Sequence, residues 1–387
     1  TVTTTEAEIE ALLAKDFSRW DDPAEWSDKD KQLLEAWKSA ERGDIVTDAD
    51  GNMTITVVDA IEVEATSNIQ AKTLANGNVF LNSAKTMNLG DVTVGGELRL
   101  KTKESINANT IEAADRIVLE ASGGTIGKGV KQVASDGTTS EIGFMKIKGS
   151  VDNLIARAED DIKLNKEGDL GVDLIFSEQG DVVIDLASAD GTKNNLTAAS
   201  EGVNIKADSV TLTNIATAGT SEAKLGVAVD GGLFKATVAD TAHIATYETM
   251  DGAQINAGTL EVTNKGVLTK SNFTASGSDA STFTNTGRFL NSKVTTQGNL
   301  NVLNLEAGAI STPDGEWDLR SEFASKKGSV SYSAGPNTET YAVIFKAAKD
   351  VDVKLESAKI TPDIYSIDAG GNVKIKADKD LDAGTIN

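Results

Sequence analysis

Three short segments of the chain repeat at a nearly constant interval: Gly-Asn-Val-Phe-Leu at 77–81, Gly-Glu-Leu-Arg-Leu at 96–100 and Asp-Arg-Ile-Val-Leu at 115–119. In each, two aliphatic residues bracket one other residue. Ile61 and Val63 do the same, so this apolar series advances by 18, 19 and 19 residues. Such alternation is typical of a β-strand that buries one face. An internal repeat of this length indicates a solenoid.

Two further apolar series share this period. The first consists of Ile69, Met87, Ile106 and Ile126, and the second of Leu74, Val92 and Ile111. One repeat cannot bury its apolar face alone, but stacked copies form ladders about 4.8 Å apart. Three ladders per coil predict an all-β fold, a right-handed parallel β-helix (solenoid) of about 19–20 residues per coil with a triangular cross-section. The hand follows from the crossover rule, and glycine is expected at corners that need positive φ.

The same alternation continues through most of the chain. Residues 162–164 and 182–184 are 20 residues apart, and residues 353–355 precede residues 373–375 by 20. Between about 215 and 345 the spacing is looser, which predicts an irregular stretch. The strands still expected there contain Leu260 and Val262, Leu300 and Val302, and Leu303 and Leu305. The last coil has no visible capping element, which favours a longer parent solenoid or end-to-end self-association.

Residues 5–43 have a helical period instead. Apolar residues recur there at the 3.6-residue spacing of an amphipathic helix. Ser27, with Asp30 three residues later, is close to a capping box, and Gly43 occupies a C′ position. This pattern predicts an N-terminal α-helical hairpin.

The predicted domain organisation therefore has two parts. Residues 1–50 form the helical hairpin, as an extension or insertion, and residues 51–387 form the β-helical shaft. Within the shaft we expect an insertion near 128–150, where the alternation stops, and the irregular stretch near 215–345.

The composition excludes several classes of function. The chain of 387 residues has a formal net charge of -22, one His and no Cys. An acidic protein without a basic patch does not suit a nucleic-acid partner. The lack of Cys excludes disulfides and thiolate metal sites, and a lone His cannot build a His-based metal cluster. No run of 18 apolar residues is present, so no segment is expected to span a membrane as a helix.

The order of several coils resembles a known family. Residues 151–164 (Val-Asp-Asn-Leu-Ile-Ala-Arg-Ala-Glu-Asp-Asp-Ile-Lys-Leu) precede Gly-Asp-Leu-Gly-Val-Asp-Leu-Ile-Phe-Ser-Glu-Gln-Gly-Asp-Val-Val-Ile-Asp-Leu at 168–186 and follow Ile-Val-Leu-Glu-Ala-Ser-Gly-Gly-Thr-Ile-Gly at 117–127. This succession resembles the repeat regions of large filamentous-haemagglutinin-like exoproteins, including leukotoxin-like filamentous adhesins, over about residues 55–387. The resemblance implies a right-handed β-helix that is exported to the bacterial surface for adhesion. No match to the secretion domain of that family is visible, so we expect a shaft segment.

Two candidate binding elements lie near the N-terminus. Arg42, Gly43 and Asp44 form an integrin-type tripeptide. Binding to a host integrin is one interpretation, and a helix C-terminus with its C′ glycine is the other, which the chance frequency of tripeptides favours. Three of the four Trp residues lie in the hairpin and would supply an aromatic contact surface if it projects from the shaft. These residues are Trp20, Trp26 and Trp37.

One short segment is similar to a calcium-binding loop. Asp48, Asp50 and Asn52 alternate as the first ligands of an EF-hand loop do, but Met53 replaces the glycine that the loop requires. A polar turn explains these residues better. We therefore predict no cofactor and no dedicated metal site, and at most weak calcium binding by the acidic surface.

Acidic residues also allow an enzymatic alternative, because several polysaccharide-degrading enzymes are β-helices. The nearest candidates are Asp160 with Asp161 and Asp115 with Arg116. These charges occupy outward strand positions, where solvation explains them, and His243 is expected to be a surface or half-buried residue. The sequence therefore predicts no catalytic residue.

Together these patterns predict a non-enzymatic, extracellular segment of a large bacterial surface or secreted exoprotein. It would attach the bacterium to host cells, other bacteria or surfaces through a surface receptor or a glycan. A self-assembling surface-layer or filament subunit is the alternative, and a β-helical polysaccharide lyase or hydrolase is the second alternative.

Overall fold

The computed structural model describes residues 2–4, 42–47, 53–58, 79–83, 86–129, 131–133, 139–141, 143–311, 320–356 and 359–387. These residues form an all-β parallel β-solenoid of about 13 turns with about 21 residues per coil. The predicted parallel solenoid is thus confirmed, with slightly longer coils than expected. The chain divides into two compact units, Thr1–Thr192 (unit 1) and Lys193–Asn387 (unit 2).

A small antiparallel sheet precedes the described coils of unit 1. It has the order β1-β3-β2, with β1 at Val2–Thr4, β2 at Arg42–Thr47 and β3 at Met53–Val58. Arg42 and Gly43, which we expected at a helix end, instead begin β2, where Arg42 lies opposite Val58. The remainder of the expected helical hairpin lies outside the described residues.

The coils of unit 1 follow the registers that the apolar series predict. Val79 lies opposite Leu98, and Leu98 lies opposite Ile117. Likewise Met87 lies opposite Ile106. The second and third series share one long strand in each coil, because β5 spans Met87–Val94 and β7 spans Ile106–Ala113. The other coil strands of unit 1 are β4 (Val79–Ser83), β6 (Leu98–Thr102), β8 (Ile117–Ala121), β9 (Ile126–Lys128), β12 (Lys146–Lys148), β13 (Val151–Ala158), β14 (Ile162–Lys166), β15 (Leu170–Ser177) and β16 (Asp181–Asp185).

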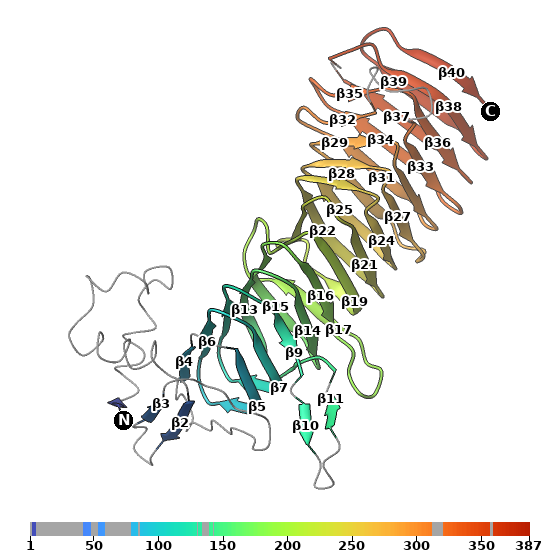
Figure 1. The fold of residues 1–387 in the computed structure, drawn as a ribbon. Coiled ribbons are helices and arrows are strands. Elements are labelled where there is room, and N and C mark those ends of the chain that lie inside the picture. The colour runs from blue at the N-terminus through green and yellow to red at the C-terminus, as the bar shows by residue number, and fades with distance from the viewer. Residues whose placement is uncertain are drawn as a thin grey trace. The chain divides into compact units, whose positions relative to one another are not determined.

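An antiparallel pair of strands interrupts these coils where we expected an insertion. Strands β10 (Lys131–Val133) and β11 (Thr139–Glu141) pair with each other and project from unit 1 (Figure 1). The chain is back in the coils by β12, in which Ile147 is buried opposite Ile111. The projecting segment is therefore shorter than the predicted 128–150.

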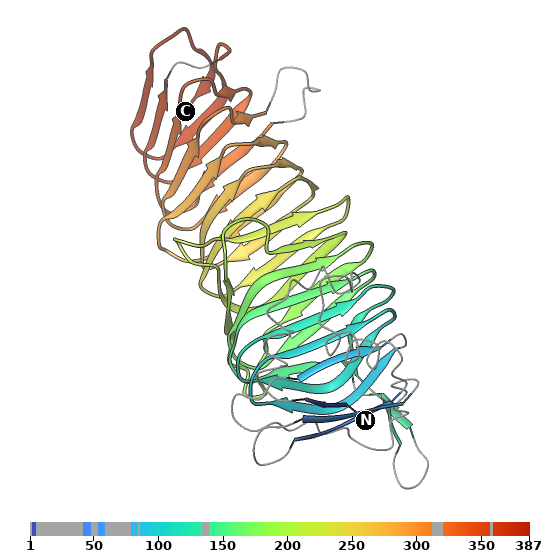
Figure 2. The ribbon, with the colours of Figure 1, turned by 90° about the vertical axis from the view of Figure 1, so that its left-hand side faces the viewer.

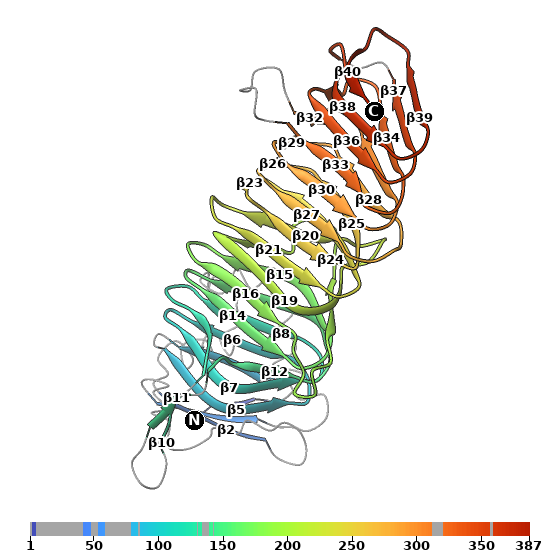
Figure 3. The ribbon, with the colours of Figure 1, turned by 90° about the vertical axis from the view of Figure 1, so that its right-hand side faces the viewer.

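Unit 2 has three separate strands in most coils, and these stack as three parallel ladders (Figures 2 and 3). Ladder A contains β18 (Ile205–Ala207), β20 (Leu225–Val229), β22 (Thr241–Tyr247), β25 (Thr259–Asn264), β28 (Ser281–Asn285), β31 (Leu300–Asn304), β34 (Val330–Ala334), β37 (Val351–Leu355) and β39 (Val373–Ala377). Ladder B contains β23 (Thr249–Asp251), β26 (Val267–Thr269), β29 (Arg288–Leu290), β32 (Ala309–Ile310) and β35 (Glu339–Thr340). Ladder C contains β19 (Ser209–Ala218), β21 (Phe234–Val238), β24 (Gln254–Ala257), β27 (Asn272–Ala275), β30 (Lys293–Thr296), β33 (Glu322–Ser325), β36 (Val343–Ala347), β38 (Asp363–Ala369) and β40 (Asp382–Ile386). The remaining strand of unit 2, β17 (Asn194–Ala198), pairs with β19.

Three expectations for unit 2 were wrong. Residues 215–345 are not irregular, because ladders A and C continue through the described part of this range and ladder B runs beside them from Thr249 onward. Leu303 and Leu305 do not form an inward pair, since Asn304 between them is buried and Leu305 is exposed. Near the C-terminus the register differs by two residues, because Val373 lies opposite Val351. A shift of two keeps the same side chains inside, so periodicity alone cannot detect it.

The interior of unit 2 contains aromatic rings and a column of amides. The rings of Phe283 and Phe289 are 4.7 Å apart, and those of Phe289 and Phe323 are 5.5 Å apart, measured between centroids. Beside them, Asn264 Nδ2 donates to Asn285 Oδ1 at 2.8 Å, and Asn285 Nδ2 donates to Asn304 Oδ1 at 2.9 Å. All three amides are fully buried. Each coil thereby supplies the hydrogen-bond partner that a buried amide requires.

The corners between ladders B and C depart from the expected glycines. Residues with φ near +50° occupy this corner in successive coils without being glycine: Lys270 (φ 48), Asn291 (φ 46), Ser311 (φ 54) and Ala342 (φ 47). A buried serine follows two of these corners, and the amide of Ser271 donates to Ser292 Oγ at 2.9 Å. Hydrogen bonds between coils therefore stabilise a backbone conformation that usually favours glycine.

Candidate functional site

Six of the residues selected from the sequence lie outside the described part of the chain. This applies to Trp20, Trp26 and Trp37, and to Asp48, Asp50 and Asn52. The tripeptide Arg42–Gly43–Asp44 lies at the start of β2, where Asp44 is opposite Thr56. It therefore belongs to a paired strand in this structure, and its binding role stays a prediction.

The acidic pair at residues 160–161 is engaged in the stacking of coils. Asp161 accepts a hydrogen bond from the Asp181 amide at 3.0 Å and one from Lys163 Nζ at 2.8 Å. Burial alone would raise the pKa of Asp161, but these two hydrogen bonds and the charges of Lys163 and Lys128 together outweigh it and lower the pKa. A carboxylate held in its charged form by neighbours in the wall has no proton to donate as a general acid at neutral pH.

The single histidine is also paired with a neighbour. His243 Nδ1 lies 2.7 Å from Glu261 Oε2, and these residues are opposite each other in ladder A. The two groups are close but not aligned for a hydrogen bond, because His243 Nδ1 is buried without a hydrogen-bond partner among the described residues. Lys224 Nζ lies 3.6 Å from the other oxygen of Glu261. The half-buried position expected for His243 agrees with its 16% side-chain exposure.

Neither a metal cluster nor a membrane helix is present in the described residues. No three His, Cys, Asp or Glu side chains come close enough there to hold a metal ion. Within the same ranges, no helix combines the length and hydrophobicity that a bilayer crossing requires.

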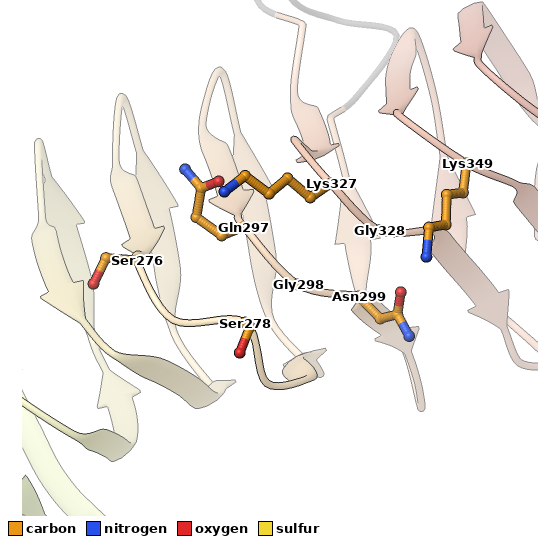
Figure 4. A pocket seen from close by; sticks show the side chains of 8 residues that line it. All are labelled: Ser276, Ser278, Gln297, Gly298, Asn299, Lys327, Gly328 and Lys349. Carbon is orange, nitrogen blue, oxygen red and sulfur yellow. The ribbon is translucent and has the colours of Figure 1, made fainter.

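A polar groove lies along the outside of unit 2, where ladder C turns into ladder A (Figure 4). Four successive turns form it, following β27, β30, β33 and β36. It is open to solvent and has a volume of about 460 Å³. Its lining residues are Ser276, Ser278, Gln297, Gly298, Asn299, Lys327, Gly328 and Lys349.

Backbone hydrogen bonds hold these turns in line. The amide of Gln297 donates to the Ala275 carbonyl at 3.0 Å, and the amide of Lys327 donates to the Gln297 carbonyl at 3.1 Å. The amide of Lys349 continues the series with the Gly328 carbonyl, also at 3.1 Å. The backbone hydrogen bonds that join successive coils therefore also fix the positions of the turns. The shape of the groove is thus set before any ligand binds.

Two glycines, Gly298 and Gly328, allow neighbouring turns to approach closely at the base of the groove. A Cβ atom on Gly298 would lie 2.2 Å from the carbonyl oxygen of Ser278. A Cβ atom on Gly328 would lie 2.5 Å from Asn299 Oδ1. Both distances are too short for a real side chain, so the close approach of the turns requires glycine. The carbonyl oxygen of Gly298 accepts hydrogen bonds from Thr296 Oγ1 and Ser325 Oγ, at 2.7 and 2.6 Å.

The lining offers hydroxyl, carboxamide and ammonium groups, and none of its eight residues is acidic. Asn299 Oδ1 accepts the Ser329 amide at 2.9 Å, which orients that side chain. Within the described residues, the side chains of Gln297, Lys327 and Lys349 have no hydrogen bond or ion pair with the protein. These polar groups are therefore available to a ligand that carries many hydrogen-bonding atoms.

Sequence reasoning missed this groove entirely. Its residues come from turns that are far apart in the chain, and all of them except Lys349 lie in the range we expected to be irregular. One signal was present, because Gly277, Gly298 and Gly328 each follow a ladder C strand by two or three residues. Aligning the chain on those strands would have placed the four turns side by side.

Comparison with known proteins does not identify a family for this chain. No protein-family model matches the chain, and neither curated proteins nor solved structures yield a match.

Proposed function

We propose that this chain is a structural and adhesive segment of a large bacterial surface or secreted exoprotein. Its coils form a shaft, and the groove of unit 2 binds a glycan on a host cell, another bacterium or a surface. The observation that carries this proposal is the groove itself, a row of available hydrogen-bonding groups on four backbone-linked turns. Sugars present many hydroxyl groups, which carboxamides and ammonium groups bind well.

The solenoid supports a mechanical role. Each coil pairs with the next through parallel strands, so a load is shared by many backbone hydrogen bonds. The proposal includes a right-handed coil of triangular cross-section and membership of the filamentous-haemagglutinin-like exoproteins, as the succession of residues 117–186 suggests. Extracellular location belongs to the same proposal.

The chemistry of the lining favours binding over cleavage. Glycoside hydrolysis uses two carboxyl groups placed on either side of the scissile bond. The eight lining residues include neither a carboxylate nor an imidazole. We therefore propose that the groove holds its ligand without cleaving it.

A glycan array probed with the purified full chain tests the proposal. We expect at least one class of glycan to bind. Gln297→Trp, which fills the groove, should abolish that binding. Gln254→Trp is the matched control because Gln254 is exposed on β24, outside the groove lining.

Two results would contradict the proposal. The first is no binding to any glycan on the array, and the second is equal loss in both Trp variants. Release of new reducing ends from a bound polysaccharide would replace the binding proposal with the enzymatic alternative.

A further inference from the structure

We infer that the ligand of the groove is an acidic oligosaccharide, one whose sugar rings carry carboxylate or sulfate groups. This inference rests on the proposed function, because it names the class of glycan that the same groove would bind. Its basis is the charge of the lining, which is opposite to that of the whole chain.

The local charge is the first argument. The chain has 59 acidic and 37 basic residues and a net charge of -22. An anionic polymer is therefore repelled by most of the surface. The groove differs, because it has Lys327 and Lys349 on neighbouring turns and no acidic residue among its lining. A ligand whose charge the rest of the protein repels is recognised best at such a site.

The free state of these two lysines is the second argument. Other lysines in unit 2 are neutralised by a carboxylate in the same wall. These include Lys206, Lys224, Lys293, Lys346 and Lys359. Lys327 and Lys349 have no such partner in the described residues, although acidic residues outnumber basic ones in the chain. An anionic ligand would supply these two ammonium groups with the counter-charge that the wall does not provide.

The nearest acidic residues in the chain do not remove this charge. Asp350 follows Lys349, but its Oδ1 accepts the Asn372 amide at 2.7 Å, in the next coil. Asp279 follows Ser278 and is exposed outside the lining. Neither carboxylate forms an ion pair with Lys327 or Lys349 in the described structure.

The order of groups along the groove is the third argument. Hydroxyl and carboxamide groups occupy the first two turns, at Ser276, Ser278, Gln297 and Asn299. The two lysines come from the next two turns, and the Lys327 side chain extends toward Gln297 (Figure 4). A sugar chain lying along the stack would place hydroxyl groups on the first pair of turns and its acidic groups beside the lysines. The volume of the groove, about 460 Å³, falls in the usual range of ligand sites, roughly 300–1,000 Å³.

The test measures binding of three soluble polysaccharides to the full chain: polygalacturonate, dextran sulfate and neutral dextran. Titration calorimetry is run at low and at high salt. We expect an acidic polymer to bind, dextran to bind at least about tenfold more weakly, and added salt to weaken the acidic ligand because it screens exposed charges. Binding of polygalacturonate alone would show that the groove recognises a carboxylate, and binding of dextran sulfate alone would show that it recognises a sulfate.

A pair of variants separates the groove from general charge. Lys327→Gln/Lys349→Gln should reduce affinity for the acidic polymer by about tenfold or more. Lys374→Gln/Lys376→Gln makes the same change of charge on exposed positions of β39 and should leave the affinity within about twofold. Both double variants change exposed side chains only, and equal thermal unfolding of both would confirm that the fold is retained.

Three results would overturn the inference. The first is that dextran binds as tightly as the acidic polymers and that Gln297→Trp abolishes its binding. This result would keep the proposed function but reject an acidic ligand. Equal loss in both lysine pairs would show a general charge effect and reject the groove. Absence of binding to all three polymers and to every glycan on the array would reject the inference and the proposed function together.

Discussion

The two units build their interiors from different side chains. Buried ladder positions of unit 1 are mostly aliphatic, as in the column of Leu81, Leu100 and Leu119. Unit 2 instead stacks phenylalanine rings and a buried column of asparagines. The difference teaches that the interior of one solenoid can be filled either by aliphatic side chains or by aromatic rings together with buried amides that hydrogen-bond from coil to coil.

Coil lengths vary in both units. In unit 1, side-chain contacts between neighbouring coils join residues that are 18, 19 and 20 apart, but the β10–β11 pair lengthens the step between the opposite residues Ile111 and Ile147 to 36 residues. In unit 2 the amide column has steps of 21 and 19 residues, the step from Thr246 to Asn264 is 18, and one coil step reaches 30. Variable turns do not disturb the ladders, but they change the outer surface. The groove arises in unit 2, where the turns between ladders C and A carry polar side chains.

The largest effect is expected from the aromatic column. Phe323→Ala should lower the free energy of unfolding of unit 2 by about 3–5 kcal/mol, because it removes a fully buried ring that contacts Phe289, Phe345 and Tyr332. Urea unfolding followed by hydrogen exchange in β33 measures this loss. A loss below about 1 kcal/mol would show that the aromatic column is not part of the packed core.

The amide column should give the next largest effect. Asn285→Leu leaves Asn304 Oδ1 without its donor and Asn264 Nδ2 without one acceptor, so we expect a loss of about 2–4 kcal/mol. The matched control in unit 1 is Asn107→Leu. Asn107 donates to Asn88 at 2.9 Å, but its own Oδ1 is buried without a partner. We expect a loss of less than about 1 kcal/mol there. Equal losses at both positions would remove the distinction between the two units.

The smallest effect concerns an ion pair that links three coils. Glu322 lies 2.7 Å from Lys293 and 2.9 Å from Lys346, and its side chain is 16% exposed. Burial would raise the pKa of Glu322, but the two lysines outweigh it and lower the pKa. The stabilisation is therefore present above the unfolded pKa of about 4.3 and is lost as the pH falls through the lower folded pKa.

Glu322→Gln should accordingly destabilise unit 2 by about 1 kcal/mol at pH 7 and have no effect in strong acid. Thermal unfolding across this pH range measures it. The control is Glu356→Gln, because the Lys354–Glu356 pair is about half exposed and should contribute almost nothing. A constant effect of Glu322→Gln at all pH values would rule out the ion pair as its cause.

Sequence periodicity predicted unit 1 well for a physical reason. Its inward residues are aliphatic and its coils before the β10–β11 pair are nearly equal in length, so the registers of Leu98 with Ile117 and Met87 with Ile106 follow from the spacing. The same reasoning failed in unit 2. Asn264, Asn285 and Asn304 point inward, yet a polar residue is normally assigned to an outer face. Leu305 was wrongly expected to point inward with Leu303, but it is exposed. Single exposed leucines are common on protein surfaces, so an apolar residue alone does not indicate the inner face.

The groove could not be predicted because it depends on the register between coils of unequal length. Its turns contain Ser, Gln, Asn and Lys, which are ordinary turn residues when each is considered alone. Only the stacking places the turns of Lys327 and Lys349 side by side, with no carboxylate partner for either among the residues that the structure describes. The register of these coils is therefore the central claim on which the site depends.

Cysteine cross-linking tests that register most directly, because the chain has no cysteine of its own. Asn301 and Ser331 lie opposite each other in ladder A although they are 30 residues apart, and Ser331 Oγ donates to Asn301 Oδ1 at 2.9 Å. Asn301→Cys/Ser331→Cys should oxidise readily to a disulfide, whereas Asn301→Cys/Ser333→Cys should not, because Ser333 lies opposite Leu303 and a disulfide requires Cα atoms within about 7 Å. Preferential cross-linking of the second pair, or of neither, would contradict the stacking that builds the groove.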